Sequence, residues 1–141
     1  ILHAGDVYKA SVLDELQEVA PVIAALGNGD RGLSHDPRVR PTHVLSFDGL
    51  TVGLVHGLAY PFLPISATFG RDVNVVVFGH THIAGVELED GVLLVNPGSP
   101  TLPSNLVGVP GTVGILEILG GRARARILNI DGRNNQPASA P

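Results

Sequence analysis

The stretch Val75-Val76-Val77-Phe78-Gly79-His80-Thr81-His82 decides how the rest of the chain is interpreted. Its first four residues are apolar and mostly β-branched, which is typical of a strand buried on both faces. Gly79 then allows a sharp turn, and two histidines follow one residue apart. Because the strict alternation of strand side chains need not hold in a turn, His80 and His82 can converge on one point. The stretch therefore predicts a buried strand that delivers two candidate metal ligands.

Three other apolar runs also end in a residue that can bind a metal, beside a glycine. They are Asp6 after Gly5, Asn28 between Gly27 and Gly29, and His56 before Gly57. In layered α/β folds, functional side chains collect beyond the carboxyl ends of the strands, so these residues are expected to meet at one edge. Carboxylate, imidazole and amide oxygen can together bind divalent transition metals. Two such ions can activate a water and hold a phosphoryl group.

The segments between these runs predict a layered α/β domain. Apolar residues spaced three and four apart indicate a helix that Ser11 caps and Pro21 ends. Residues 22–26 are expected to form a second buried strand and residues 31–41 a surface loop. The segment 58–70 is expected to be a mobile rim with about one helical turn at 65–69. Three hairpins are predicted, around Asp48-Gly49, Asp90-Gly91 and Gly120-Gly121.

The composition limits the classes of protein to which the chain can belong. With 44% hydrophobic and 16% charged residues, the sequence predicts a globular domain at 1–130 and a flexible tail at 131–141. No apolar run approaches the roughly 20 residues that span a bilayer, so no membrane partner is expected. The net charge of −4 gives no strong signature of nucleic-acid binding. The absence of cysteine excludes thiolate metal sites and suits a cytoplasmic location.

Several motifs together resemble the calcineurin-like metallophosphoesterase superfamily, and in particular its small YfcE-type phosphodiesterase branch. They are Gly5-Asp6, Gly27-Asn28-Gly29-Asp30, His56-Gly57, Gly79-His80-Thr81-His82 and Asn96-Pro97-Gly98-Ser99. The resemblance covers roughly residues 1 to 130. It implies an α/β fold in which a metallophosphoesterase-like two-sheet sandwich is flanked by helices. It also implies a hydrolase that cleaves phosphodiesters, as small-molecule phosphoester substrates, by a metal-activated water.

Roles follow from the resemblance by position. Asp6 would bridge two ions, and Asn28, His56 and His80 would complete one site while His82 would belong to the other. The catalytic residues would be Asp6, His56, His80 and His82, and the three histidines would surround the phosphoryl oxygens together with the ions. The implied ions are divalent transition metals, one or two per chain, with Mn²⁺ first and Ni²⁺, Fe²⁺ or Zn²⁺ as alternatives.

The family pattern begins with a strand, an Asp-x-His block and a helix, and nothing in the sequence precedes Ile1. We therefore expect an N-terminally truncated domain without the first strand and helix, in which His82 serves an incomplete site. This leaves open whether the 141-residue form is active. The alternative is an impaired or inactive member that serves as a binding or scaffold module, as in the retromer scaffold subunit. Two ions per chain would favour the enzyme, and zero or one would favour the module.

Other residues receive structural interpretations. Asp30 and Arg31 are assigned to a surface turn, and the turn at Asn96 is expected to support the site from behind. The arginines of the last predicted strand, Arg122, Arg124 and Arg126, are expected to face water. His3, His35 and His43 are not assigned as ligands. The physiological substrate, the native metal and the oligomeric state, a homo-oligomer included, stay open.

Overall fold

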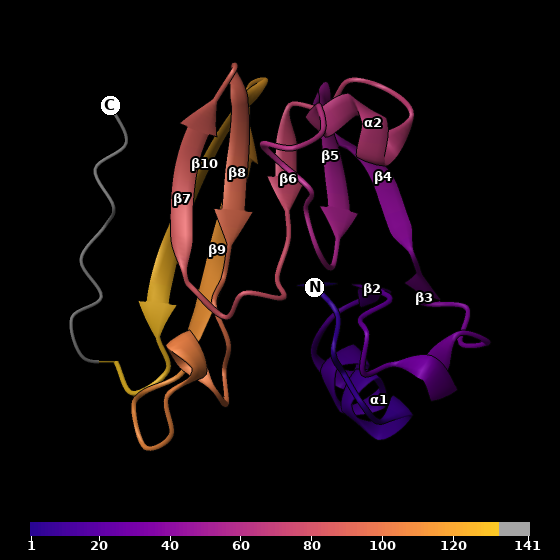
Figure 1. The fold of residues 1–141 in the computed structure, drawn as a ribbon, viewed down its shortest axis with the longest axis vertical. Helices are drawn as coiled ribbons and strands as arrows, with labels where there is room; N and C mark the ends of the chain where they lie inside the picture. Colours follow the sequence, from indigo (N-terminus) through magenta and orange to yellow (C-terminus); the bar gives the residue numbers. More distant parts are fainter. Residues whose placement is uncertain (133–141) are drawn as a thin grey trace.

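The computed structural model describes residues 1–132, so all but the first two residues of the expected tail lie outside the described residues. Figure 1 shows an α/β fold with few helices and three sheets. In chain order the elements are β1 (Leu2–His3), α1 (Ala10–Val19), β2 (Ile23–Ala25), η1 (Arg31–Leu33), β3 (Val39–Arg40), β4 (Thr42–Phe47), β5 (Leu50–Val55), α2 (Ile65–Phe69), β6 (Val75–Val77), β7 (Gly85–Glu89), β8 (Val92–Asn96), η2 (Pro103–Asn105), β9 (Thr112–Leu119) and β10 (Arg122–Asn129). Within residues 1–132, no helix is long and apolar enough to cross a membrane.

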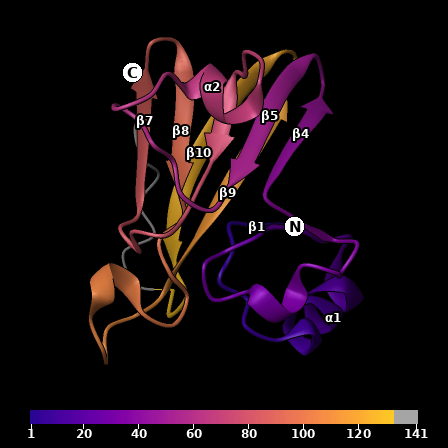
Figure 2. The same cartoon turned by 45° about the vertical axis from the view of Figure 1, so that its right-hand side comes forward.

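The sheets differ in strand direction. Strands β1, β2 and β3 form a small parallel sheet, whereas β4-β5-β6-β8-β7 form a mixed sheet with a parallel centre. The β9–β10 hairpin is the third sheet, and it packs on one face of the five-stranded sheet (Figure 2). Helix α2 and the segment before it cover the opposite face of that sheet. The expected two-sheet sandwich is therefore present.

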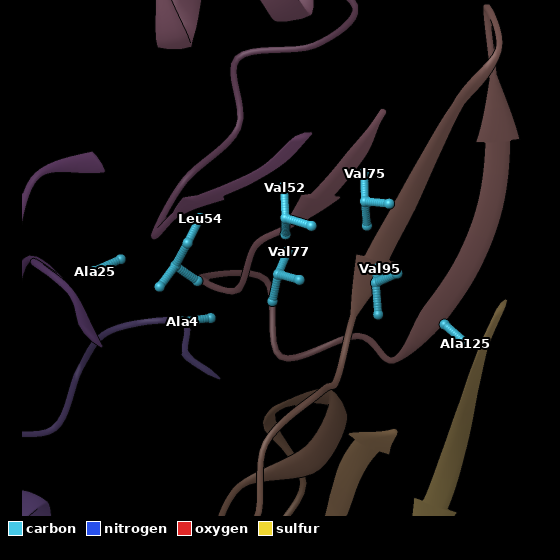
Figure 3. Close-up of a cluster of buried hydrophobic side chains, with 8 residues drawn as sticks. All are labelled: Ala4, Ala25, Val52, Leu54, Val75, Val77, Val95 and Ala125. Carbon is cyan, nitrogen blue, oxygen red and sulfur yellow. The ribbon is translucent and has the colours of Figure 1, made fainter. Parts of the chain in front are cut away.

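One cluster of small and branched side chains joins the three sheets. Figure 3 shows its buried members, which are Ala4, Ala25, Val52, Leu54, Val75, Val77, Val95 and Ala125. Ala4 and Ala25 come from the N-terminal segment, and Ala125 comes from the β9–β10 hairpin. Because buried side chains are closely packed, the cluster holds the small sheet against the larger one.

The central strand β6 has the environment that its sequence predicts. All three of its residues are buried, and it runs parallel to β5 on one side and β8 on the other. Parallel neighbours place their carboxyl ends at the same edge, so the residues that follow β5, β6 and β8 lie together. Strands β1 and β2, which pair with each other, lie next to that edge, as β2 in Figure 1 and β1 in Figure 2 show.

The three predicted hairpins are confirmed. Strand pairs β4–β5, β7–β8 and β9–β10 are antiparallel and close through two-residue turns. Both central residues of each turn have positive φ, for example +46° at Asp48 and +82° at Gly49. This is the backbone that a type I′ turn requires, and it explains the Asp-Gly and Gly-Gly pairs. In the last hairpin Arg122 and Arg124 are exposed while Ala125 is buried, as expected, but Arg126 is half-buried.

Two local predictions are wrong. Helix α1 begins at Ala10 after Lys9, which makes no side-chain cap, so Ser11 lies inside the helix instead of capping it. The segment 31–41 is not only a loop, because it contains η1 and the short edge strand β3. This segment is held by Arg38, which pairs with Asp36 at 2.6 Å and with Asp14 of α1 at 2.9 Å.

The Asp36–Arg38 pair predicts a pH dependence of stability. Side-chain hydrogen bonds from Arg38 lower the pKa of Asp36 from 3.8 to about 2. The folded protein therefore holds the proton less tightly than the unfolded chain, and the stabilisation is lost as the pH falls from about 4 to about 2. In urea unfolding, we expect Asp36→Asn to be less stable than wild type near pH 6 and the difference to shrink toward pH 2.5. A difference that stays constant over this range would contradict the prediction, and Asp72→Asn at an exposed carboxylate is the control.

Candidate metal centre

Asp6 lies in a turn just after β1, against the turn that follows β2. A Cβ on Gly27 would lie 2.3 Å from Asp6 Oδ1, so the two turns can approach only because this residue is glycine. Gly29 N–H donates to Asp6 Oδ1 at 2.8 Å. The second oxygen, Oδ2, lies 3.5 Å from His56 Nε2. The turn contacts therefore fix one carboxylate oxygen and leave the other directed at the imidazole.

His56 follows β5 and is the most buried of the candidate ligands, with 8% of its surface exposed. Its Nδ1 lies 2.7 Å from the carbonyl oxygen of Ala4, which can only accept, so Nδ1 carries a proton and donates. In the neutral ring Nε2 is then an electron-pair donor. It lies 3.0 Å from Asn28 Oδ1 and 3.2 Å from His80 Nδ1.

These atoms are suited to binding a cation. Nε2 of His56 and the facing oxygens of Asn28 and Asp6 all carry lone pairs, and a cation between them would satisfy all three. Ligand bonds of about 2.0–2.2 Å would separate neighbouring donor atoms by roughly 3.0–3.5 Å. The observed separations of 3.0, 3.2 and 3.5 Å agree with this. The separations of the other three side chains from Nε2 of His56 are therefore compatible with a shared divalent ion.

The amide of Asn28 is needed for this fit. Within residues 1–132, no group of three or more His, Cys, Asp and Glu side chains forms a metal-binding cluster by itself. Asp6 and His80 each lie within 3.5 Å of Nε2 of His56, and Asn28 is the further donor beside the same atom. An imidazole, carboxylate and amide set suits a divalent first-row metal more than a soft ion that prefers thiolate.

His80 and His82 have strained backbones. Their φ angles are +68° and +60°, and Asp6 has +56°, all in the left-handed region that few non-glycine residues adopt. Strain of this kind clusters at ligand sites, where neighbouring contacts impose it. His80 points to His56, whereas Nδ1 of His82 is buried and has no hydrogen-bond partner within residues 1–132. The structure thus joins Asp6, Asn28, His56 and His80 and leaves His82 with an unsatisfied ring nitrogen.

Asn96, at the end of β8, supports the histidine turn from behind, as the sequence predicts. Its Nδ2 donates to the carbonyl of Gly79 at 3.3 Å and to Thr81 Oγ1 at 2.9 Å. Its Oδ1 accepts the Gly98 N–H at 3.0 Å. This buried amide therefore connects the tight turn after β8 to the strained turn that carries His80 and His82.

Asp30 is a further residue that the sequence interpretation placed wrongly. It is not in a surface turn but is fully buried, with 0% of its surface exposed. Its Oδ2 accepts the Gly27 N–H at 2.9 Å, and its Oδ1 accepts the Tyr8 N–H at 2.8 Å. One carboxylate thus links the Asn28 turn to the Asp6 turn, whereas neighbouring Arg31 is exposed as expected. The sequence signal that could have indicated this burial is its position two residues after the candidate ligand Asn28, in the same turn.

The remaining histidines lie outside the convergence. Burial lowers the pKa of His3, against the opposing effects of Asp30 and Asp6, so its Nδ1 stays available to accept the Gly5 N–H at 3.2 Å. His43 donates from Nε2 to the carbonyl of Ala24 at 2.8 Å, and His35 is exposed. Their exclusion from the candidate ligands agrees with these contacts.

Comparison with known proteins extends the resemblance beyond the motifs. The calcineurin-like phosphoesterase superfamily domain matches residues 1–121. A probable metallophosphoesterase of Methanothermobacter thermautotrophicus is 44% identical over 111 residues, which cover 73% of this chain and 61% of that protein. The phosphodiesterase YfcE of Escherichia coli K12 is 33% identical over 113 residues, which cover 77% of this chain and 59% of that protein. The chain thus spans less than two thirds of the length of these relatives.

A structural neighbour gives a further comparison of the fold. Vps29 of Chaetomium thermophilum superposes with a TM-score of 0.76 over 99% of this chain and 76% of its own. The sequence identity is 18%, so the likeness concerns the fold alone.

Proposed function

The chain belongs to the calcineurin-like phosphoesterase superfamily, and from this premise we propose that it hydrolyses phosphodiesters with the help of divalent metal ions. The observation that carries the proposal is the convergence of Asp6, Asn28 and His80 on Nε2 of His56. A relative named as a phosphodiesterase supports the choice of a diester over a monoester.

The four converging side chains would hold the ion, with manganese as the first choice and nickel, iron or zinc as alternatives. A divalent ion bound there would supply Lewis-acid chemistry that makes water nucleophilic near neutral pH. The chain's own residues set the geometry. Gly29 fixes Asp6 by an N–H bond to Oδ1, and Ala4 fixes the His56 tautomer by accepting from Nδ1. A hydrogen bond from the ring N–H of a ligand histidine to a carbonyl, such as the one from His56 to Ala4, raises the basicity of the other ring nitrogen and orients the ring.

The substrate would enter from the exposed side of the centre. Asn28 and His80 are exposed, whereas His56 is buried behind them. In this proposal His80 would contact both the ion and the phosphoryl oxygens. His82 follows on the same turn, and its buried Nδ1, which has no hydrogen-bond partner among residues 1–132, is the atom we assign to a second ion or to a phosphoryl oxygen.

Hydrolysis of bis(p-nitrophenyl) phosphate with added Mn²⁺ tests the proposal. We expect His80→Ala to lose about a hundredfold or more of the wild-type rate, because a bound metal contributes several kcal/mol of charge stabilisation. His35→Ala, at an exposed histidine outside the centre, is the matched control and should keep the wild-type rate. Equal rates in wild type and His80→Ala would contradict the proposal.

A further inference from the structure

Tyr8 is an exposed aromatic side chain at the rim of the candidate metal centre. It follows Asp6 by two residues, and 67% of its surface is accessible. Its ring lies across Gly29, where a Cβ would be 2.4 Å from Cε1 and 2.7 Å from Cζ of the ring. Gly29 in turn donates its N–H to Asp6 Oδ1. A single residue without a side chain therefore separates the ring from the Asp6 carboxylate.

The backbone of Tyr8 is held in an unfavourable conformation. Its φ is +64°, which is a genuine outlier for a bulky side chain. The buried Asp30 carboxylate holds this conformation by accepting the Tyr8 N–H at 2.8 Å. Strain that the surrounding structure imposes in this way is typical of positions that contact a ligand.

Packing does not account for this placement. The ring is mostly exposed, so burial contributes little, and within residues 1–132 its hydroxyl has no hydrogen-bond partner. Tyr60 is the contrast, because it packs on a core cluster and its hydroxyl donates to Glu89 at 3.3 Å. Tyr8 thus presents an exposed aromatic ring next to Gly29, the residue that follows Asn28 and donates to Asp6.

Resting on the proposed phosphodiester hydrolysis, we infer that Tyr8 contacts the substrate and selects phosphodiesters that carry an aromatic group. The phosphoryl group would occupy the metal centre while the aromatic group stacks on the Tyr8 ring. Offset or edge-to-face aromatic pairs improve affinity by roughly threefold to tenfold. The inferred substrate class is therefore an aryl or other aromatic phosphodiester, in preference to a dialkyl one.

Phosphonates that cannot be hydrolysed separate the two parts of this inference. Calorimetry with Zn²⁺ present would compare phenylphosphonate with methylphosphonate on four proteins. In wild type, Tyr8→Phe and Tyr60→Phe, phenylphosphonate should bind roughly threefold to tenfold more tightly than methylphosphonate. In Tyr8→Asn that advantage should disappear while methylphosphonate affinity is unchanged, because asparagine tolerates positive φ but has no ring.

Tyrosine signals give a second readout that does not depend on activity. The chain has two tyrosines and no tryptophan, so a protein labelled in its tyrosine rings gives two sets of ring signals, and Tyr60→Phe assigns those of Tyr8. Phenylphosphonate should shift the Tyr8 ring signals, and methylphosphonate should leave them in place.

The outcomes distinguish this inference from the proposed function. Equal affinity for both phosphonates in wild type, or unshifted Tyr8 signals, would overturn the role of Tyr8 while methylphosphonate binding still supported the phosphoryl site. Failure of both phosphonates to bind would overturn the proposed function and the inference together.

Discussion

His56→Gln is expected to abolish metal binding and to lower phosphodiester hydrolysis by about a hundredfold or more. Nε2 of His56 is the atom that the other three donors face, at 3.0, 3.2 and 3.5 Å. Its removal leaves Asp6, Asn28 and His80 without the buried donor that completes their arrangement. Metal content after dialysis and calorimetric titration with Mn²⁺ would measure the loss of binding.

His43→Gln is the matched control for this variant. His43 also donates a ring N–H to a backbone carbonyl, that of Ala24, but it lies outside the centre. It should retain wild-type metal binding and activity, whereas His56→Gln loses both. Undiminished Mn²⁺ affinity in His56→Gln would show that the convergence around this ring is not a metal site.

Asp30→Asn is expected to reduce both stability and metal affinity. The Asp30 carboxylate accepts two N–H groups, from Gly27 and from Tyr8, and the asparagine amide can accept only through its one oxygen. One buried donor is then left unpaired, which costs about 1–3 kcal/mol of unfolding free energy. Because the same bonds align the Asp6 and Asn28 turns, metal affinity should also fall, by about tenfold to a hundredfold.

Urea unfolding without metal and calorimetric titration with metal would measure the two effects of Asp30→Asn separately. Asp48→Asn is the control, because the Asp48 carboxylate also accepts backbone N–H groups, from Gly120 and Gly121, but is exposed. Asp48→Asn should lower the free energy of unfolding only slightly, since water can bind the freed N–H groups. Equal unfolding free energies for wild type and Asp30→Asn would contradict the linking role of Asp30.

Local sequence signals were sufficient for the hairpin turns and for the central strand. The type I′ turn at Asp48-Gly49 needs two residues that accept positive φ, and those two residues specify it. The strand Val75–Val77 is buried on both faces because its side chains are all apolar. The start of α1 was misplaced because serine is a residue type that favours the N-cap, whereas the N-cap position in the structure is Lys9.

The sequence by itself determined the set of candidate ligands, because Asp6, Asn28, His56 and His80 each end an apolar run beside a glycine, and His82 follows His80 by two residues. Only the tertiary structure decided how these residues meet. His56 and Ala4 are 52 positions apart, yet the bond between them selects the tautomer that leaves Nε2 unprotonated. The burial of Asp30 could not be predicted from the sequence either, since it arises from two turns packed together at Gly27. Such contacts depend on side chains distant in the chain, so no local pattern of residues encodes them.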